Sequence, residues 1–122
     1  MTKGELAKKF YLEGYNCAQA VALAFKDEMG ISENDAKRLI VGFGGGFGRQ
    51  GLVCGAVSGM TMVIGAVNGG SDKLACYAIV VKACEEVKER LGSLDCKDIK
   101  AQNKAPCAEV CQIVADITEK YI

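Results

Sequence analysis

The chain has 122 residues, half of them hydrophobic and a quarter charged, with a single proline. This composition is typical of a folded domain and argues against disorder, so we expect one domain over residues 1–122. Fifteen basic and fifteen acidic side chains balance, so we expect no nucleic-acid partner. There are seven cysteines but no histidine, which excludes a His-assisted nucleophile and a mixed Cys/His zinc site.

The first five residues lack the basic and then apolar profile of a signal peptide, which favours a cytoplasmic protein. In that compartment, seven cysteines indicate metal binding or redox activity rather than a disulfide framework. The most apolar run covers residues 51–67. It contains several glycines and is shorter than the roughly twenty apolar residues that a membrane span requires, so we expect no membrane insertion.

The N-terminal third of the chain predicts three helices. Thr2 and Glu5 have the spacing of a capping box at the start of the first helix. A second helix is expected over residues 15–29, where apolar residues recur at steps of three and four. Ser32 or Asn34 can cap the third helix, which ends at a glycine-rich stretch.

A central apolar helix is expected to begin near Val53 and to run to about residue 67. Gly55 and Gly59 lie one turn apart on it, in the small-residue spacing that allows close helix packing. Because glycine lets another group approach the main chain, this pair predicts that a second backbone presses against the central helix.

Three further helices are expected after residue 70. The longest covers residues 73–91, begins at Ser71 or Asp72, and turns an apolar face inward. The residues predicted to face inward are Leu74, Tyr77, Ala78, Val81, Val87 and Leu91. A short helix over residues 96–102 and a last one opening at Pro106 follow. Because no segment alternates apolar and polar residues, we predict an all-α domain of five to seven helices with a glycine-rich loop before the central helix.

The glycine-rich stretch over residues 42–59 places one cysteine at the predicted start of the central helix. Unpaired backbone N–H groups and the positive end of the helix dipole would favour the thiolate of Cys54 there. The thiolate is the form that binds metals and attacks disulfides. The alternative is that Cys54 is a small buried side chain, and the local sequence leaves both interpretations open.

Residues 46–51 fit the G-x-G-x-x-G pattern of dinucleotide-binding proteins, but no strand–turn–helix unit surrounds them. We expect instead that the glycines let backbone N–H groups approach the sulfur atoms of a thiolate or a bound cluster. These glycines are Gly44, Gly45, Gly46 and Gly55. Arg49 either adds positive charge beside that site or is an ordinary exposed loop residue.

No pair of cysteines has the C-x-x-C spacing, which excludes a thioredoxin-type motif and disfavours a zinc ribbon. A metal or iron–sulfur site would therefore have to be assembled by the tertiary fold. Its ligands would be Cys17, Cys54, Cys96 and one of Cys107 or Cys111. Cys76 and Cys84 lie on one predicted helix among Ala, Ile and Val residues, so we expect them to be part of the core.

Several motifs occur in an order that resembles one family. They are Gly-Tyr-Asn-Cys-Ala-Gln-Ala-Val at residues 14–21, Gly-Phe-Gly-Gly-Gly at 42–46, Cys-Gly-Ala-Val-Ser-Gly at 54–59, Gly-Ser-Leu-Asp-Cys at 92–96, and a terminal helix with a cysteine. Together they span nearly the whole chain and resemble the C_GCAxxG_C_C family, small bacterial and archaeal domains described as redox-active. The central motif here inverts the Gly-Cys order of the family's label.

This resemblance implies a redox or metal-binding role through four cysteines. Carried onto this sequence, the four are Cys17, Cys54, Cys96 and Cys111, with Cys107 as the alternative to the last. The family is also similar to the iron–sulfur-bearing part of split-Soret cytochromes, which favours an iron–sulfur cluster over zinc as the cofactor.

Three functions follow as hypotheses. The first is electron transfer through an iron–sulfur cluster or another metal, with a redox partner protein of unknown identity. The second is a thiol–disulfide redox protein in which Cys54 attacks and a neighbouring cysteine resolves. The third is a non-catalytic helical interaction module. A homodimer stays an open alternative.

Overall fold

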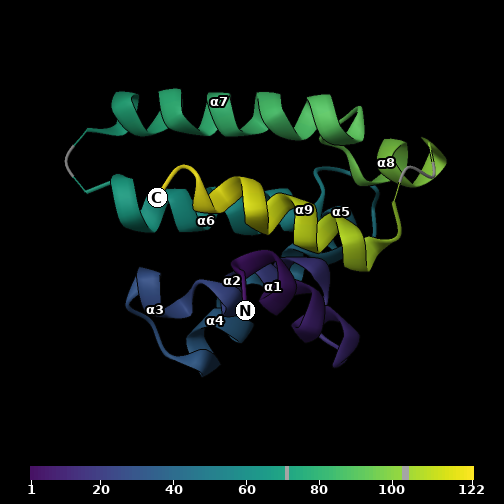
Figure 1. The fold of residues 1–122 in the computed structure, drawn as a ribbon, viewed down its shortest axis with the longest axis horizontal. Helices are drawn as coiled ribbons and strands as arrows, with labels where there is room; N and C mark the ends of the chain where they lie inside the picture. Colours follow the sequence, from purple (N-terminus) through teal and green to yellow (C-terminus); the bar gives the residue numbers. More distant parts are fainter. Residues whose placement is uncertain (71, 103–104) are drawn as a thin grey trace.

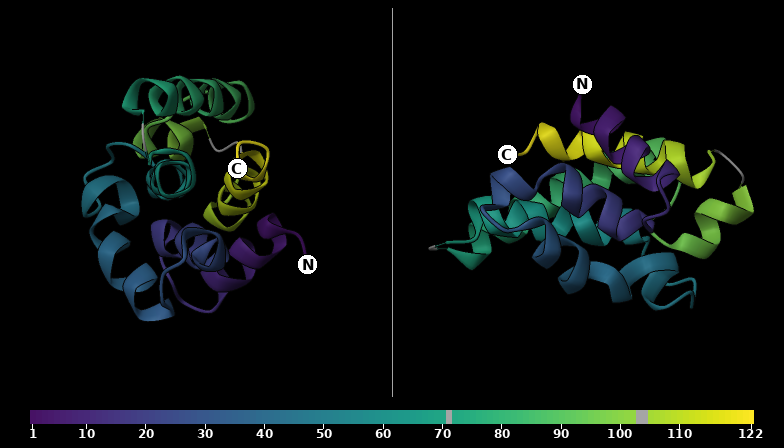
Figure 2. Two further views of the ribbon diagram at one scale, coloured as in Figure 1. Left: turned by 90° about the vertical axis from the view of Figure 1, so that its left-hand side faces the viewer. Right: turned by 90° about the horizontal axis from the view of Figure 1, so that it is seen from below.

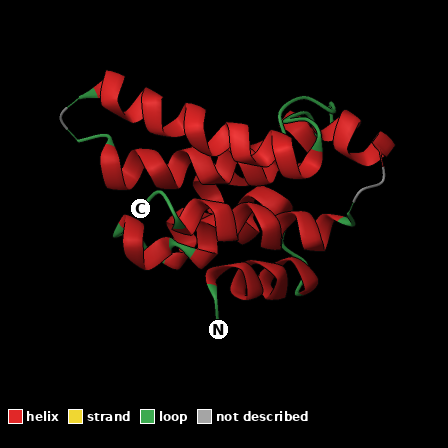
Figure 3. Cartoon of the chain, turned by 45° about the horizontal axis from the view of Figure 1, so that its top comes forward, coloured by secondary structure: helices red, strands yellow, loops and turns green. Residues whose placement is uncertain are grey.

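The computed structural model describes residues 1–70, 72–102 and 105–122. Within these ranges all regular structure is helical and no β-strand occurs (Figure 3), so the predicted all-α class is confirmed. Seven of the helices in the described ranges have seven or more residues. None of the described helices is both long enough and apolar enough to cross a membrane.

In chain order the elements are α1 (Lys3–Leu12), α2 (Cys17–Ala24), α3 (Lys26–Met29), α4 (Glu33–Ile40), the 3₁₀ turn η1 (Val41–Phe43), α5 (Gly44–Phe47), α6 (Gly55–Asn68), α7 (Lys73–Leu91), α8 (Cys96–Gln102) and α9 (Cys107–Glu119).

Helix α6 lies at the centre of the fold. It contacts α2, α7 and α9, and the end-on view in Figure 2 shows these neighbours around it. Figure 1 shows α7 along one side of the molecule, α6 and α9 in the middle, and α1 to α4 on the other side. The hydrophobic core follows this arrangement, because Met60 and Ile64 of α6 share one buried cluster with Val21 of α2, Val87 of α7 and Val114 of α9.

Two glycines let α2 approach α6 closely. A Cβ atom at Gly59 would lie 3.0 Å from the Cβ of Val21 and 3.1 Å from the carbonyl oxygen of Ala18. A Cβ atom at Gly55 would overlap the Sγ of Cys17. The predicted close approach of a second backbone is therefore confirmed, and that backbone belongs to α2.

Side-chain caps fix the starts of four helices. Thr2 and Asn16 form capping boxes before α1 and α2. Ser32 caps α4, and Asp72 caps α7 by accepting hydrogen bonds from two backbone N–H groups of its first turn. Ser71, the other predicted start of α7, lies outside the described residues.

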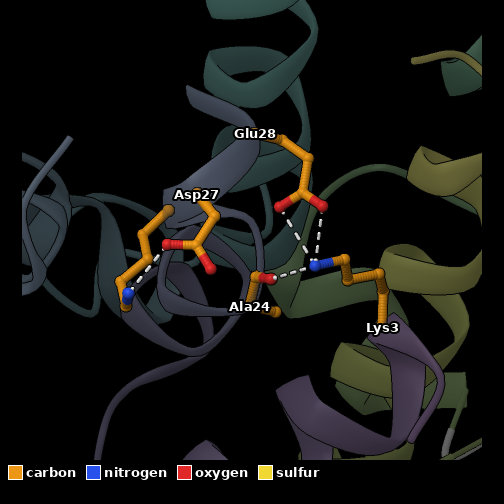
Figure 4. Close-up of polar contacts among 5 residues, drawn as sticks. Lys3, Ala24, Asp27 and Glu28 are labelled. Atoms are coloured by element: carbon orange, nitrogen blue, oxygen red, sulfur yellow. Dashed lines mark hydrogen bonds and ion pairs between the residues drawn. The ribbon is translucent and has the colours of Figure 1, made fainter. Parts of the chain in front are cut away.

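The predicted helix over residues 15–29 is interrupted, so that α2 and α3 are separate helices. Phe25, which lies between them, has φ −113° and ψ 14° and is fully buried. The Nζ of Lys3 donates a hydrogen bond to the carbonyl oxygen of Ala24 at 3.1 Å and pairs with Glu28 at 2.8 Å (Figure 4). A side chain from α1 thus satisfies a carbonyl at the end of α2. Lys3 lies outside residues 15–29, so the sequence of that segment alone does not reveal this contact.

Helix α7 has the predicted bounds, but the prediction of its inward face is wrong in part. Val87 and Leu91 are buried as expected, together with Cys76 and Ala83. The four predicted inward residues that are exposed instead are Leu74, Tyr77, Ala78 and Val81. The helix packs against α6 and α9, and Ile79, Val80 and Cys84 are partly buried against the core instead.

We predict that Gly59→Ala lowers the free energy of unfolding by about 1–3 kcal/mol, because the added methyl group must displace Val21 or the carbonyl of Ala18. Gly65→Ala is the matched control in α6, since a Cβ atom there meets nothing within 4 Å. It should raise the free energy of unfolding by about 0.5–1 kcal/mol through helix propensity. Urea denaturation followed by circular dichroism measures both. Stabilisation by both substitutions would show that α2 does not press against α6 at Gly59.

Candidate functional site

Helices α5 and α8 meet at one end of the molecule (Figure 1). Residues of both helices line a cavity of about 1060 Å³. Its walls come from the end of α1, the turn before α2, the glycine-rich stretch, α8 and the start of α9. The four cysteines that line it are Cys17, Cys54, Cys96 and Cys107. The fold therefore brings most of the predicted cysteine set to one place, although these residues are far apart in the sequence.

Cys17 and Cys54 form a hydrogen-bonded pair of sulfur atoms in the wall of the cavity. Cys17 is the first residue of α2, and Cys54 is the N-cap residue of α6. Hydrogen bonding from the Cys54 thiol lowers the pKa of Cys17 from its ordinary value to about 6. The pKa of Cys54 is raised, first by hydrogen bonding of its thiol to Cys17 and then by burial. The pair therefore holds one negative charge, on Cys17.

Backbone N–H groups add to the stabilisation of the Cys17 thiolate. The groups of Gly45, Ala18 and Ala56 lower the pKa of Cys17 further, after the larger effect of Cys54. Ala56 lies in the first turn of α6, so the Cys17 sulfur is at the positive end of that helix. The approach is possible because Gly55 has no Cβ atom where the sulfur lies.

Contact with Cys17 and burial raise the pKa of Cys54, and they outweigh the N–H groups of Val57 and Ala56 at the start of α6, which lower it as predicted. The start of α6 therefore favours a thiolate on both sulfur atoms, but on balance only the pKa of Cys17, which comes from α2, is lowered. Cys54 is only 4 % exposed, and its neighbour Cys17 already carries the charge, so a second negative charge is disfavoured. The central helix also begins at Gly55, two residues later than predicted.

The predicted glycines have different roles in this site. Gly45, at φ 66°, directs its N–H group to Cys17. Gly44 has no room for a side chain, because a Cβ atom there would lie 2.5 Å from the side chain of Asn16. Gly46 contacts the backbone of Leu52 so closely that a Cβ atom would overlap it. Gly44 and Gly45 line the cavity, whereas Gly46 shapes the loop behind it.

A short backbone ladder holds α8 against the glycine-rich stretch. The N–H of Cys54 donates to the carbonyl of Leu94 at 2.8 Å, and the N–H of Cys96 donates to the carbonyl of Leu52 at 2.7 Å. This ladder positions Cys96 beside the pair of thiols. Burial raises the pKa of Cys96, and the nearby ammonium of Lys100 offsets part of that rise.

The two candidates for the fourth cysteine differ in their surroundings. Cys107 is the first residue of α9 and lines the cavity together with Tyr11. Cys111 is fully buried one turn later, and burial raises its pKa. The pKa of Tyr11 is raised to about 12, mainly by burial and then by Cys107. No spacing or motif in the sequence pointed to Tyr11.

Cys76 and Cys84 lie on α7, outside the described lining of the cavity. Cys76 is buried and Cys84 is half-buried against the core, as expected for structural cysteines. Burial raises the pKa of Cys84, so it provides a reference for the thiols of the cavity.

Among the described residues, which include all seven cysteines, no group of three or more Cys, Asp or Glu side chains is close enough to hold a metal ion. The cavity thus gathers the predicted ligands in one region, but their side chains do not form a ligand set in this arrangement.

We predict that iodoacetamide alkylates Cys17 with a half-maximal rate near pH 6. The thiolate is the reactive form, so the rate falls as the pH falls through the pKa and levels off above it. Cys84 is the internal control, because its raised pKa keeps its rate rising at alkaline pH. Cys54→Ala removes the thiol donor and should move the Cys17 midpoint upward by about one to two pH units. Mass mapping of labelled peptides gives each rate, and a Cys17 midpoint near about 8.5 would contradict the assignment.

Comparison with known proteins agrees with a site at which several cysteines are gathered. The model of a family described as "Putative redox-active protein (C_GCAxxG_C_C)" matches residues 15–121, a range that includes all seven cysteines. No curated protein and no solved structure matches the chain significantly. The chain therefore belongs to the C_GCAxxG_C_C family.

Proposed function

We propose that the protein is a thiol–disulfide redox protein in which Cys17 attacks and Cys54 resolves. The observation that carries the proposal is the hydrogen-bonded pair of thiols, with the pKa of Cys17 lowered to about 6. Most Cys17 side chains are then thiolates at neutral pH, before any substrate binds. Cys17 is half-buried and lines the cavity, whereas Cys54 is almost fully buried beside it. This reverses the roles expected from the sequence, where Cys54 was the attacking residue.

The reaction has two exchange steps. The Cys17 thiolate attacks one sulfur of a substrate disulfide, which forms a mixed disulfide and releases the first substrate thiolate. Cys54 then gives up its proton to the released thiolate or to water, attacks the sulfur of Cys17, and releases the second substrate thiolate. Two protein thiols are oxidised to one disulfide while one substrate disulfide is reduced to two thiols.

The raised pKa of Cys54 suits it to act second. Two of its three main causes, the hydrogen bond to Cys17 and the charge of Cys17, require Cys17 to be a thiolate. Once Cys17 is in a mixed disulfide, both causes are gone and the pKa of Cys54 falls. Cys54 therefore becomes a better nucleophile only after the first step, which prevents both thiols from competing for the same substrate.

The variants Cys17→Ser and Cys54→Ser test this order of events. With excess disulfide, the wild-type cavity should release two equivalents of substrate thiol and form a Cys17–Cys54 disulfide. Cys54→Ser should release one equivalent and keep a mixed disulfide on Cys17, because no resolving thiol is present. Cys17→Ser should slow release of the substrate thiol by about a hundredfold or more, since Cys17 is the cavity cysteine whose pKa is lowered, whereas the pKa values of Cys54 and Cys96 are raised.

Released thiol and the mass of each cysteine-containing peptide measure these outcomes. Cys84→Ser is the matched control on α7 and should leave the release from the cavity unchanged. The proposed roles are wrong if Cys54→Ser still yields two equivalents of thiol, or if Cys17→Ser reacts as fast as the wild type.

A metal- or cluster-bearing electron-transfer domain is the second candidate. The observation that favours it is the shared cavity of Cys17, Cys54, Cys96 and Cys107, since thiolates are the ligands of iron–sulfur clusters and of zinc. A bound cluster would supply one-electron chemistry. Its ligands would have to move together first, because the described side chains form no ligand set.

Metal analysis of anaerobically purified protein separates the two candidates. For the thiol reaction we expect iron, acid-labile sulfide and zinc well below one equivalent per chain. Iron and sulfide in stoichiometric amounts would support the cluster instead, provided that Cys96→Ser loses them and Cys84→Ser retains them. Cys96 is the informative position, because it lines the cavity but has no part in the proposed exchange.

A further inference from the structure

We propose that the cavity selects low-molecular-weight disulfides that carry anionic groups. This proposal rests on the proposed function and adds its substrate class. The first observation is the charge of the cavity lining. Among the described residues, Arg49, Lys97 and Lys100 line it, and no Asp or Glu does. The chain as a whole has a net charge of +0, so this excess of positive charge is local to the cavity.

The three cations of the cavity are also not neutralised by nearby carboxylates. Other basic residues of the chain form ion pairs, such as Lys3 with Glu28 and Lys120 with Glu86. In the part of the chain that the structure describes, none of the three cavity cations has an acidic group within ion-pair distance. Their charge is therefore available to a ligand.

The cations lie on two opposing segments. Arg49 belongs to the glycine-rich stretch, where it has φ 68°, a backbone conformation that is uncommon for a residue with a side chain. Lys97 and Lys100 lie three residues apart on α8, so they share one face of that helix. Both segments are held together, because the N–H of Lys97 donates to the carbonyl of Gly51 at 3.2 Å. A ligand in the cavity thus lies between positive charges from two sides.

The charges of the cavity explain why an anionic substrate is admitted. The Cys17 thiolate alone would repel an anion, but three cations and one thiolate leave the lining with a net charge of about +2 at neutral pH. The cations are exposed, whereas Cys17 is half-buried. Carboxylates can therefore remain near the exposed cations while the disulfide reaches Cys17. The volume of about 1060 Å³ suits a small molecule.

Three disulfides of different charge test the selection: dithiodiglycolate, a dianion; bis(2-hydroxyethyl) disulfide, which is neutral; and cystamine, a dication. For each, the rate of Cys17 oxidation is compared between the wild type and the combined variant Arg49→Gln, Lys97→Gln and Lys100→Gln, so that intrinsic reactivity cancels. The variant should slow dithiodiglycolate by about tenfold or more, change the neutral reagent less than about twofold, and accelerate cystamine. Added salt should weaken the wild-type preference.

The matched control removes three positive charges from α7, which does not line the described cavity, by Lys73→Gln, Lys82→Gln and Lys88→Gln. It should leave the three rates in their wild-type ratio. If the cavity variant changes all three reagents equally, or changes none, the selection of anions is wrong, while the exchange reaction stands.

Adipate separates a failure of this inference from a failure of the exchange reaction. It has the charge and length of dithiodiglycolate but no disulfide, and its binding is measured by isothermal titration calorimetry. Adipate should bind the wild type and the α7 control and bind the cavity variant at least about tenfold more weakly. If adipate binds in this way but no disulfide oxidises Cys17, the proposed reaction is wrong and the anion site stands. If adipate does not bind the wild type, the anion site is wrong.

Discussion

The missing side chain at Gly55 is the constraint on which the site depends. It lets the sulfur of Cys17 lie against the first turn of α6, where the N–H of Ala56 helps to lower its pKa. Gly59 repeats the close contact one turn later, so α2 follows α6 rather than touching it at one point. The contact that packs the centre of the fold is thus the same contact that lowers the pKa of Cys17.

Local signals in the sequence were sufficient for much of the fold. Caps such as Thr2 and Ser32 act within one helical turn, so they can be identified from a few neighbouring residues. The predictions that were wrong depend on contacts with residues from elsewhere in the chain. The break after Ala24 is supported by Lys3 of another helix, and the apolar stripe of α7 gave no information about which side α6 and α9 would cover.

The sequence identified the cysteines of the site but not their roles. The expected effect, a thiolate stabilised at the start of the central helix, is present. It acts on Cys17 as well as on Cys54, because the tertiary fold places both sulfur atoms at that helix start, but on balance only the pKa of Cys17 is lowered. The choice between Cys107 and Cys111 likewise depends on how α9 faces α1. Tyr11, Lys97 and Lys100 have no motif or spacing that would single them out before the cavity is seen.

The two thiols lie on different helices, which distinguishes this arrangement from a C-x-x-C motif. In that motif, one helical turn sets the distance between the sulfur atoms, whereas here the packing of α2 against α6 sets it. A disulfide between Cys17 and Cys54 would close a loop of more than thirty residues, and restricting such a loop in the unfolded chain is worth about 3–4 kcal/mol. Formation of this disulfide is therefore coupled to folding. A substitution that loosens the contact between α2 and α6 lowers the stability of the fold and the tendency of the pair to oxidise at the same time.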